Sequence, residues 1–251
     1  MPGRLGHEDE VTVVDHLEEL RSRLFIAGGA IAVASIFAYV VHGRILGVLI
    51  GALPSDHRKL TTFGVTEPFT TSVKVSVVAG FLLALPVVLW QVWAFFAPAL
   101  DRDAQRSIGG FTLFAGVLLV VGVVFGDRVA LPAALKFLTN YDNSLFNIQL
   151  RAADFISFAL LVLAACGVVF ELPLVVLGLI RVRALTSAKL RRNRRLGYLI
   201  VCAVGVALPG VDPITTTIET IPLLVLFEAS IWLSAFFERR WTVVRVATDA
   251  A

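Results

Sequence analysis

Two glutamates interrupt stretches of sequence that are otherwise apolar. Glu171 lies within Val168–Pro173, and Glu228 follows Leu226 and Phe227. An acid placed at the depth of a membrane costs at least about 2.5–3.5 kcal/mol to insert. We therefore expect Glu171 to face a protein interior or a wet cavity. Either it serves the function there, or it is a neutral carboxyl hydrogen-bonded to a neighbouring helix.

A second group of polar residues lies near the N-terminus, in Asp15–Leu24. Glu19 and Arg23 are separated by about one helical turn, a spacing at which opposite charges pair. Leucines recur on one face of the same predicted helix, at Leu17, Leu20 and Leu24. Two interpretations stand side by side: an interfacial helix held by the ion pair, or an acidic cytoplasmic patch that accepts guanidinium groups.

The elements that position these residues follow from composition. Of the 251 residues, 57% are hydrophobic and only 16% are charged, and the mean hydropathy is +0.84. These values exclude a disordered chain and argue against a soluble domain. They predict an all-α polytopic membrane protein with six transmembrane helices. The spans are expected at 24–41, 73–96, 108–125, 155–180, 196–208 and 218–237.

The distribution of Lys and Arg predicts how the chain sits. If alternate loops share a side, 15 of the 22 basic residues fall on the side of both termini. The positive-inside rule then makes both termini cytoplasmic. The whole chain, 1–251, is expected to form one membrane domain, with a cytoplasmic amphipathic segment at 1–23, spans within 24–237 and a cytoplasmic tail at 238–251. Seven basic residues lie between the fourth and fifth spans, and we interpret them as an anchor to anionic lipid of the bilayer rather than a nucleic-acid site.

The sequence carries no sign of hydrolytic, metal or cofactor chemistry. Its four histidines have no metal-ligand spacing, and it contains neither a Walker loop nor a GxGxxG motif. Both cysteines, Cys166 and Cys202, lie in apolar runs and are interpreted as small buried hydrophobes. We expect no cofactor, no metal and no enzymatic activity.

Several motifs together resemble one family. The segment Asp15–Arg23 resembles the HLxELRxR segment of the TatC family, the receptor subunit of the twin-arginine protein translocase. Gln91–Leu100 is similar to the signature of its first cytoplasmic loop, and Phe170–Pro173 to its span-four motif. Further matches are Pro68-Phe69 with Lys74, Ile221-Pro222 and Leu226–Glu228, so the resemblance covers roughly residues 13–238 in order.

This resemblance implies a glove-shaped, six-helix protein of the bacterial plasma membrane. It implies recognition of twin-arginine signal peptides on folded cargo, export driven by the proton motive force, TatA-type and TatB-type single-span partners, and self-association. Glu19, with Leu20 and Arg21 beside it, matches the segment that contacts the signal arginines. Phe95 matches the neighbouring binding surface, and Glu171 matches the polar group of the concave face.

The chain also departs from the family pattern. A second signal-binding glutamate is usual at the position of Ala104, and alanine cannot accept a guanidinium. Asp101 or Asp103 could supply the missing carboxylate. The position usually occupied by glutamine in span six is Thr216, which changes the expected partner of Glu171.

Two other functions remain open from the residues. One is a proton-coupled small-solute transporter with Glu171 as the relay. The other is a membrane scaffold, for which neither Glu19 nor Glu171 would matter to export.

Overall fold

The computed structural model describes residues 13–54, 59–96, 108–141, 148–181, 185–208 and 213–249. Its regular elements in these ranges are helices, together with one isolated bridge between Thr61 and Arg151. The helices are α1 (Val13–Val40), α2 (His42–Gly51), α3 (Glu67–Phe96), α5 (Ile108–Phe125), the π-helix η3 (Gly126–Ala130), α6 (Leu131–Asn140), α7 (Ala152–Val169), α8 (Leu172–Arg181), α9 (Ser187–Arg192), α10 (Arg194–Ala207) and α11 (Pro213–Asp249).

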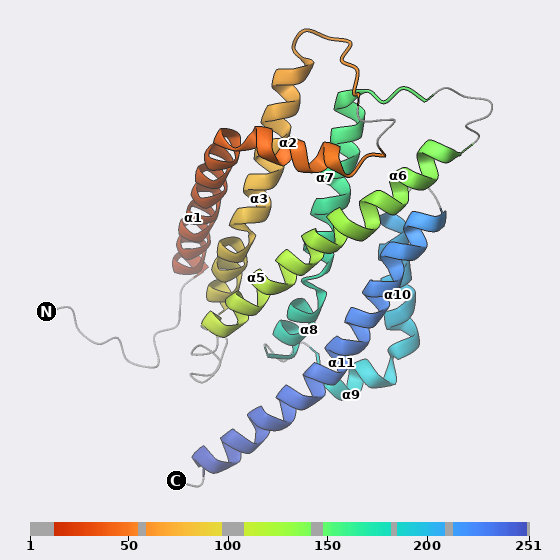
Figure 1. The fold of residues 1–251 in the computed structure, drawn as a ribbon. Helices are drawn as coiled ribbons and strands as arrows, with labels where there is room; N and C mark the ends of the chain where they lie inside the picture. Colours follow the sequence, from red (N-terminus) through yellow and green to blue (C-terminus); the bar gives the residue numbers. More distant parts are fainter. Residues whose placement is uncertain are drawn as a thin grey trace, which may run out of the picture.

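The long helices run side by side as a tilted bundle (Figure 1). Helices α1 and α3 form one edge, α10 and α11 the other, and the continuous α5–η3–α6 rod crosses the bundle diagonally between them. Helix α2 lies across one end. Helices α1 and α5 begin at the other end, and α3, α8 and α11 finish there. We call that end the N-terminal face and the end at α2 the opposite face.

Five helical stretches are long and apolar enough to cross a membrane within the part of the chain described above. They are Leu17–Val40, Glu67–Phe95, Gly109–Asn140, Ala152–Arg181 and Pro213–Glu238. The remaining predicted span corresponds to α10, which has 14 residues and rises only about 21 Å. All five long stretches overlap predicted spans, and α10 overlaps the fifth predicted span, 196–208, at the short length that its sequence indicates.

The third span does not end at Phe125 as predicted. The charged pair that suggests a loop, Asp127 and Arg128, lies instead in η3, where Arg128 Nε is 3.1 Å from Asp127 Oδ2. The helix then continues through α6 to Asn140. Because the two charges pair with each other and the Arg128 side chain is exposed, they do not stop the helix.

The fourth span is broken where Pro173 predicts a kink. Helix α7 ends at Val169 and α8 begins at Leu172, with a turn at Phe170 and Glu171. Proline has no N–H to donate to the carbonyl four residues earlier, which here belongs to Val169. Just before this proline the Glu171 amide bonds to Val168 O at 3.1 Å, which is three residues earlier rather than the four of an α-helix.

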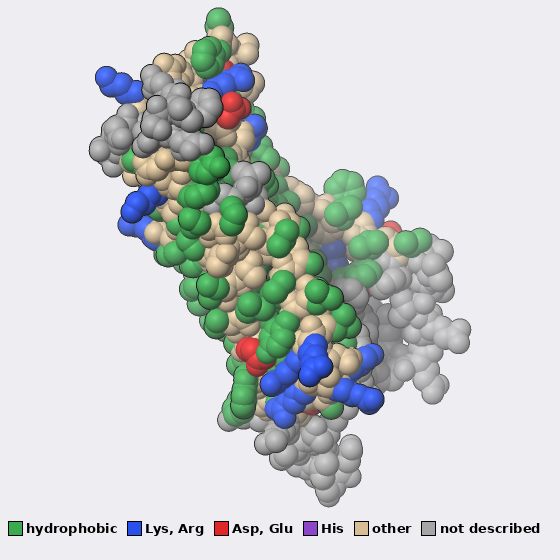
Figure 2. Space-filling model, turned by 90° about the vertical axis from the view of Figure 1, so that its right-hand side faces the viewer, with side chains coloured by type: hydrophobic (Ala, Val, Ile, Leu, Met, Phe, Trp, Pro, Cys, Tyr) green, Lys and Arg blue, Asp and Glu red, His purple; other side chains and the backbone are tan. Residues whose placement is uncertain are grey.

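Apolar side chains are divided between a core and an outer surface. Leu49, Val75, Ile156 and Val162 are among the buried residues of the main core, which joins α2, α3 and α7. Many large apolar residues of α1, α5 and α10 are exposed instead, and Figure 2 shows hydrophobic side chains spread over the middle of one face. Such a surface is unsuited to water and suits a lipid environment.

A glycine sets the position of α1 against α3. A Cβ on Gly80 would overlap the backbone and hydroxyl of Ser35, so the two helices touch through their main chains at this level. The helices are antiparallel, because α1 begins and α3 ends at the N-terminal face. Their register therefore follows from the Ser35–Gly80 contact.

Candidate functional site

An arginine of α1 is held between two acceptors at the N-terminal face. Arg23 donates from Nε (3.0 Å) and Nη2 (2.5 Å) to Glu19 Oε1. Its Nη1 donates to Gln91 Oε1 of α3 at 3.4 Å. The Arg23 and Glu19 side chains are 24% and 31% exposed, so the guanidinium is accessible from solvent but shielded on one side by protein.

The register of α1 on α3 explains this meeting. Arg23 lies 12 residues before Ser35, and Gln91 lies 11 residues after Gly80. At 1.5 Å per residue both distances are about 17 Å along the helix axis, in the same direction. The same register places Phe95, which is half-buried, at the level of Glu19.

Aromatic packing fixes the C-terminal end of α3, close to the contact of Arg23 with Gln91. A Cβ on Gly178 of α8 would overlap the Trp93 ring, so the indole lies directly on the α8 backbone. The Trp93 ring centroid is also 6.3 Å from that of Phe111 in α5. Contacts with α5 and α8 therefore hold Trp93, midway between Gln91 and Phe95, in place.

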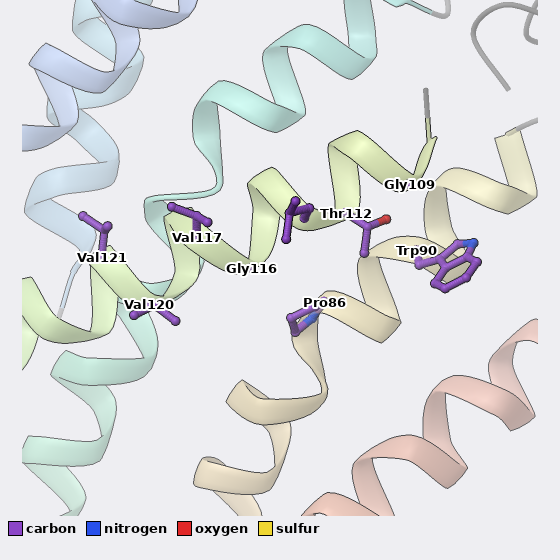
Figure 3. Close-up of a pocket in the computed structure, with 9 residues that line it drawn as sticks. Pro86, Trp90, Gly109, Thr112, Gly116, Val117, Val120 and Val121 are labelled. Atoms are coloured by element: carbon purple, nitrogen blue, oxygen red, sulfur yellow. The ribbon is translucent and has the colours of Figure 1, made fainter. Parts of the chain in front are cut away.

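An apolar groove begins near the same end of α3. It has a volume of about 580 Å³ and lies between Pro86 and Trp90 of α3 and the α5 residues Gly109, Thr112, Gly116 and Val120 (Figure 3). A Cβ atom added to Gly109 would have no neighbour within 4 Å. A Cβ atom added to Gly116 would lie 3.9 Å from Pro86 Cγ. These small residues leave space between two helices that could otherwise close together.

Glu171 lies at the break between α7 and α8 and is 3% exposed. Neither of its carboxyl oxygens has a hydrogen-bond partner among the described residues. The sequence alternative of a carboxyl bonded to a neighbouring helix is therefore not what the structure shows. Glu171 therefore keeps its hydrogen-bonding capacity inside the bundle, although most buried polar groups of folded proteins are paired.

Helix α11 brings a further acid into the interior. Glu219 is 3% exposed and Thr215, one turn before it, is fully buried. Glu219 lies within electrostatic reach of Cys166 on α7. Thr216 is only half-buried and accepts the hydroxyl of Thr220 on its carbonyl at 2.6 Å.

Glu228 connects α10 to α11. Its Oε1 accepts a hydrogen bond from the Tyr198 hydroxyl, and its Oε2 is 3.7 Å from Arg194 Nη2. The Tyr198 ring packs edge-on against Phe227, with centroids 5.7 Å apart. This carboxylate is thus already engaged by two side chains of the short α10.

A clamp on the opposite face joins α3 to α7. The buried Glu67 carboxylate accepts from Arg151 Nε at 3.2 Å, from Phe63 N at 3.0 Å and from Ala153 N at 3.1 Å. The Glu67 carboxylate raises the pKa of Arg151. Beside it, Thr61 N bonds to Leu150 O at 3.0 Å.

Comparison with known proteins agrees with this architecture. Residues 15–222 match the family described as "Sec-independent protein translocase protein (TatC)". The chain is 34% identical over 229 residues to the TatC protein of Carboxydothermus hydrogenoformans, which covers 91% of this chain and 94% of that one. It is 31% identical to the TatC protein of Escherichia coli, over 92% and 90% of the two chains. A crystal structure titled as the twin arginine translocase receptor TatC superposes with a TM-score of 0.75 at 32% identity, over 88% of this chain and 98% of that one.

The chain belongs to the TatC family. It is a multi-pass membrane protein of a protein translocase, and its all-helical fold is the TatC fold. The prediction made from the motifs is confirmed at the level of family, fold and function. The comparisons give no support to a small-solute transporter.

The predicted site residues of this TatC-family chain fall into three places. Leu20 is exposed beside Glu19, and Arg21 lies over the Phe25 ring at 5.7 Å. Glu171 and Thr216 lie inside or between helices away from that face, whereas Glu228 lies beside Arg194 at the start of α10. Asp101 and Asp103, with Ala104, lie outside the described residues, so the replacement of the missing glutamate stays a prediction.

Three polar residues that the TatC fold buries or brings into contact with another helix were not predicted as site residues from the sequence. Gln91 entered only as part of a family motif, whereas neither Glu219 nor Glu67 was singled out as a candidate. For Glu219 and Glu67 a signal existed, since an acid next to an apolar span is rare in a chain with 16% charged residues. For Gln91 the informative partner, Arg23, is 68 positions away.

Proposed function

We propose that this protein is the signal-recognition subunit of a twin-arginine translocase and that Glu19 is its arginine acceptor. The observation that carries the proposal is the guanidinium of Arg23 on the Glu19 carboxylate. A site that holds one guanidinium at the surface has the charge and the geometry to hold another. The protein acts by binding and conformational change and not as an enzyme.

The chemistry of this site suits arginine better than lysine. A guanidinium presents a rigid planar set of five N–H donors, and it pairs with a carboxylate through more than one bond. A lysine ammonium is a compact point charge without that fork. Recognition through Glu19 therefore gives a preference for arginine in the signal peptide. Leu20 and Phe95 supply apolar surface beside the carboxylate.

We place the N-terminal face in the cytoplasm of a bacterial cell. The exposed cations of α9 and the start of α10, Lys189, Arg191, Arg192 and Arg195, lie near this face. The positive-inside rule supports that orientation. Glu19 then meets signal peptides on the side where cargo is synthesised and folds.

We propose that the other subunits of the translocase assemble around this chain. TatA-type and TatB-type single-span subunits are its proposed membrane partners, with further copies of the chain itself, and the proton motive force drives export. The unpaired carboxyl of Glu171 and the buried acid Glu219 support contact with polar groups within the membrane.

Export of a twin-arginine reporter tests the role of Glu19. Glu19→Ala is expected to abolish export while the protein still inserts into the membrane, because the carboxylate that accepts the guanidinium is gone. Glu18→Ala is the matched control, since Glu18 is an exposed acid on the adjacent position, and its export is expected to stay normal. Normal export by Glu19→Ala would remove Glu19 from the site.

A further inference from the structure

The Arg23 guanidinium occupies the position that an incoming arginine needs. Both of its bonds to Glu19 end on one oxygen, Oε1. Its remaining contact, from Nη1 to Gln91 Oε1, reaches across to α3. Arg23 is therefore attached to two acceptors on two helices, and only one of them is charged.

We propose that Arg23 is a built-in competitor for the arginine site and that Gln91 is the acceptor that retains Arg23 when a signal arginine takes Glu19. The inference rests on the proposed role of Glu19. It adds two residues that set the affinity of binding. A signal peptide must displace Arg23 from Glu19, so weakly competing cations are excluded.

The exchange conserves hydrogen bonds and charge. The signal guanidinium donates to Glu19, and Arg23 gives up its Nε and Nη2 bonds there. Arg23 keeps Gln91 through Nη1, and because its side chain is 24% exposed, water can satisfy the freed N–H groups. Without Gln91, Arg23 would have no second acceptor on α3 and would remain on Glu19.

The contacts single out Arg23 among the cations nearby. Arg21 is directed onto the Phe25 ring, with its guanidinium carbon 5.7 Å from the ring centroid. Lys74 donates to Ser157 at 2.8 Å, close to the opposite end of α3. Gln91 is the neutral partner that a guanidinium can bond without a second charge.

The test is binding of a fluorescent twin-arginine signal peptide to the purified full-length chain in nanodiscs. Partly exposed ion pairs contribute about 0.4–1 kcal/mol at the upper part of their usual range, so removing the competitor in Arg23→Gln is expected to tighten binding about two- to fivefold. Gln91→Met keeps the side-chain size without the acceptor and is expected to weaken binding about twofold. In the Arg23→Gln background, Gln91→Met is expected to have no further effect.

Arg23→Lys separates competition from overall charge. It retains the positive charge but lacks the fork that bridges Glu19 and Gln91. Competition predicts binding tighter than wild type for Arg23→Lys, whereas a purely electrostatic effect leaves it at the wild-type level and overturns the proposal. A twin-lysine peptide is the control: because Arg23 competes with either peptide for Glu19, Arg23→Gln is expected to tighten the binding of both peptides by the same factor.

Different variants test the role of Glu19 and the role of Arg23. If Glu19→Gln binds the twin-arginine peptide as wild type does, the proposed site is wrong. If Glu19→Gln loses binding but Arg23→Gln binds no more tightly than wild type, the site stands and the competitor does not. A thermal unfolding midpoint for each variant shows whether a loss of binding reflects loss of the fold.

Discussion

At the scale of single residues, Glu67 shows how this protein keeps a carboxylate out of solvent. The side chain of Glu67 is 5% exposed and that of its partner Arg151 is 45% exposed. Two backbone amides, of Phe63 and Ala153, complete the acceptor capacity of the carboxylate. The acid thus satisfies donors from two separate segments, and it holds the start of α3 to the start of α7.

Glu67→Gln is expected to destabilise the protein by roughly 1–3 kcal/mol, because an amide has one acceptor oxygen where the carboxylate has two and leaves a buried donor unpaired. The measurement is thermal unfolding in detergent. Lys74→Gln is the matched control, since its bond to Ser157 links the same two helices but is exposed, and it is expected to change stability by less than about 0.5 kcal/mol. Equal midpoints for the two variants would show that the Glu67 clamp does not hold these helices.

Prominent acids could be predicted from the sequence, whereas neutral partners could not. Glu171 and Glu228 stand out because an acid in an apolar run is physically costly wherever the run is placed. Gln91 is uncharged and ordinary in composition, and its meaning depends on Arg23 lying opposite. Arg151 and Glu67 are 84 positions apart, so their pairing requires the three-dimensional path of the chain.

At the scale of helices, the contact of Gly80 with Ser35 decides where the site forms. The absence of a side chain at Gly80 lets α1 approach α3 to main-chain contact. Glu19 and Gln91 lie about 17 Å or more from that contact along their helices. A small change in the angle between the helices at Gly80 therefore becomes a larger displacement at the site.

Gly80→Ala is expected to lower stability by about 1–3 kcal/mol, the usual range for overpacking, and to weaken binding of the twin-arginine peptide as well. Gly29→Ala on the other helix of this pair is the control. A Cβ atom added to Gly29 would have no neighbour within 4 Å, and alanine has a higher helix propensity than glycine. Unfolding midpoints and peptide binding check both. Unchanged binding in Gly80→Ala would mean that the register of α1 on α3 does not position the site.

Helix positions followed from the sequence more closely than helix ends did. The apolar runs predicted where helices lie, because their lengths match a bilayer. The third span was predicted to end at Phe125, where α5 does end, but the helical path continues to Asn140 because Asp127 and Arg128 pair within η3. The kink near Glu171 was predicted correctly, since the missing N–H of Pro173 acts locally whatever surrounds it.

At the scale of the whole molecule, the two ends of the bundle differ in their chemistry. The N-terminal face carries Glu19 and the exposed cations of α9, whereas the opposite face carries α2 and the Glu67–Arg151 clamp. Exposed apolar residues such as Leu196, Leu199 and Ile200 follow directly after the cations along α10. Those cations therefore lie at the level where a bilayer changes from hydrocarbon to headgroups.

This arrangement predicts the outcome of labelling from one side of the membrane. In a background with Cys166→Ala and Cys202→Ala, Val65→Cys reports the opposite face and Ala188→Cys reports α9, and both positions are exposed. With the N-terminal face in the cytoplasm, a membrane-impermeant maleimide added to spheroplasts is expected to label Val65→Cys. Ala188→Cys is expected to react only after permeabilisation. The reverse pattern would place Glu19 outside the cell, where it could not meet newly made cargo, and would overturn the orientation and the recognition role together.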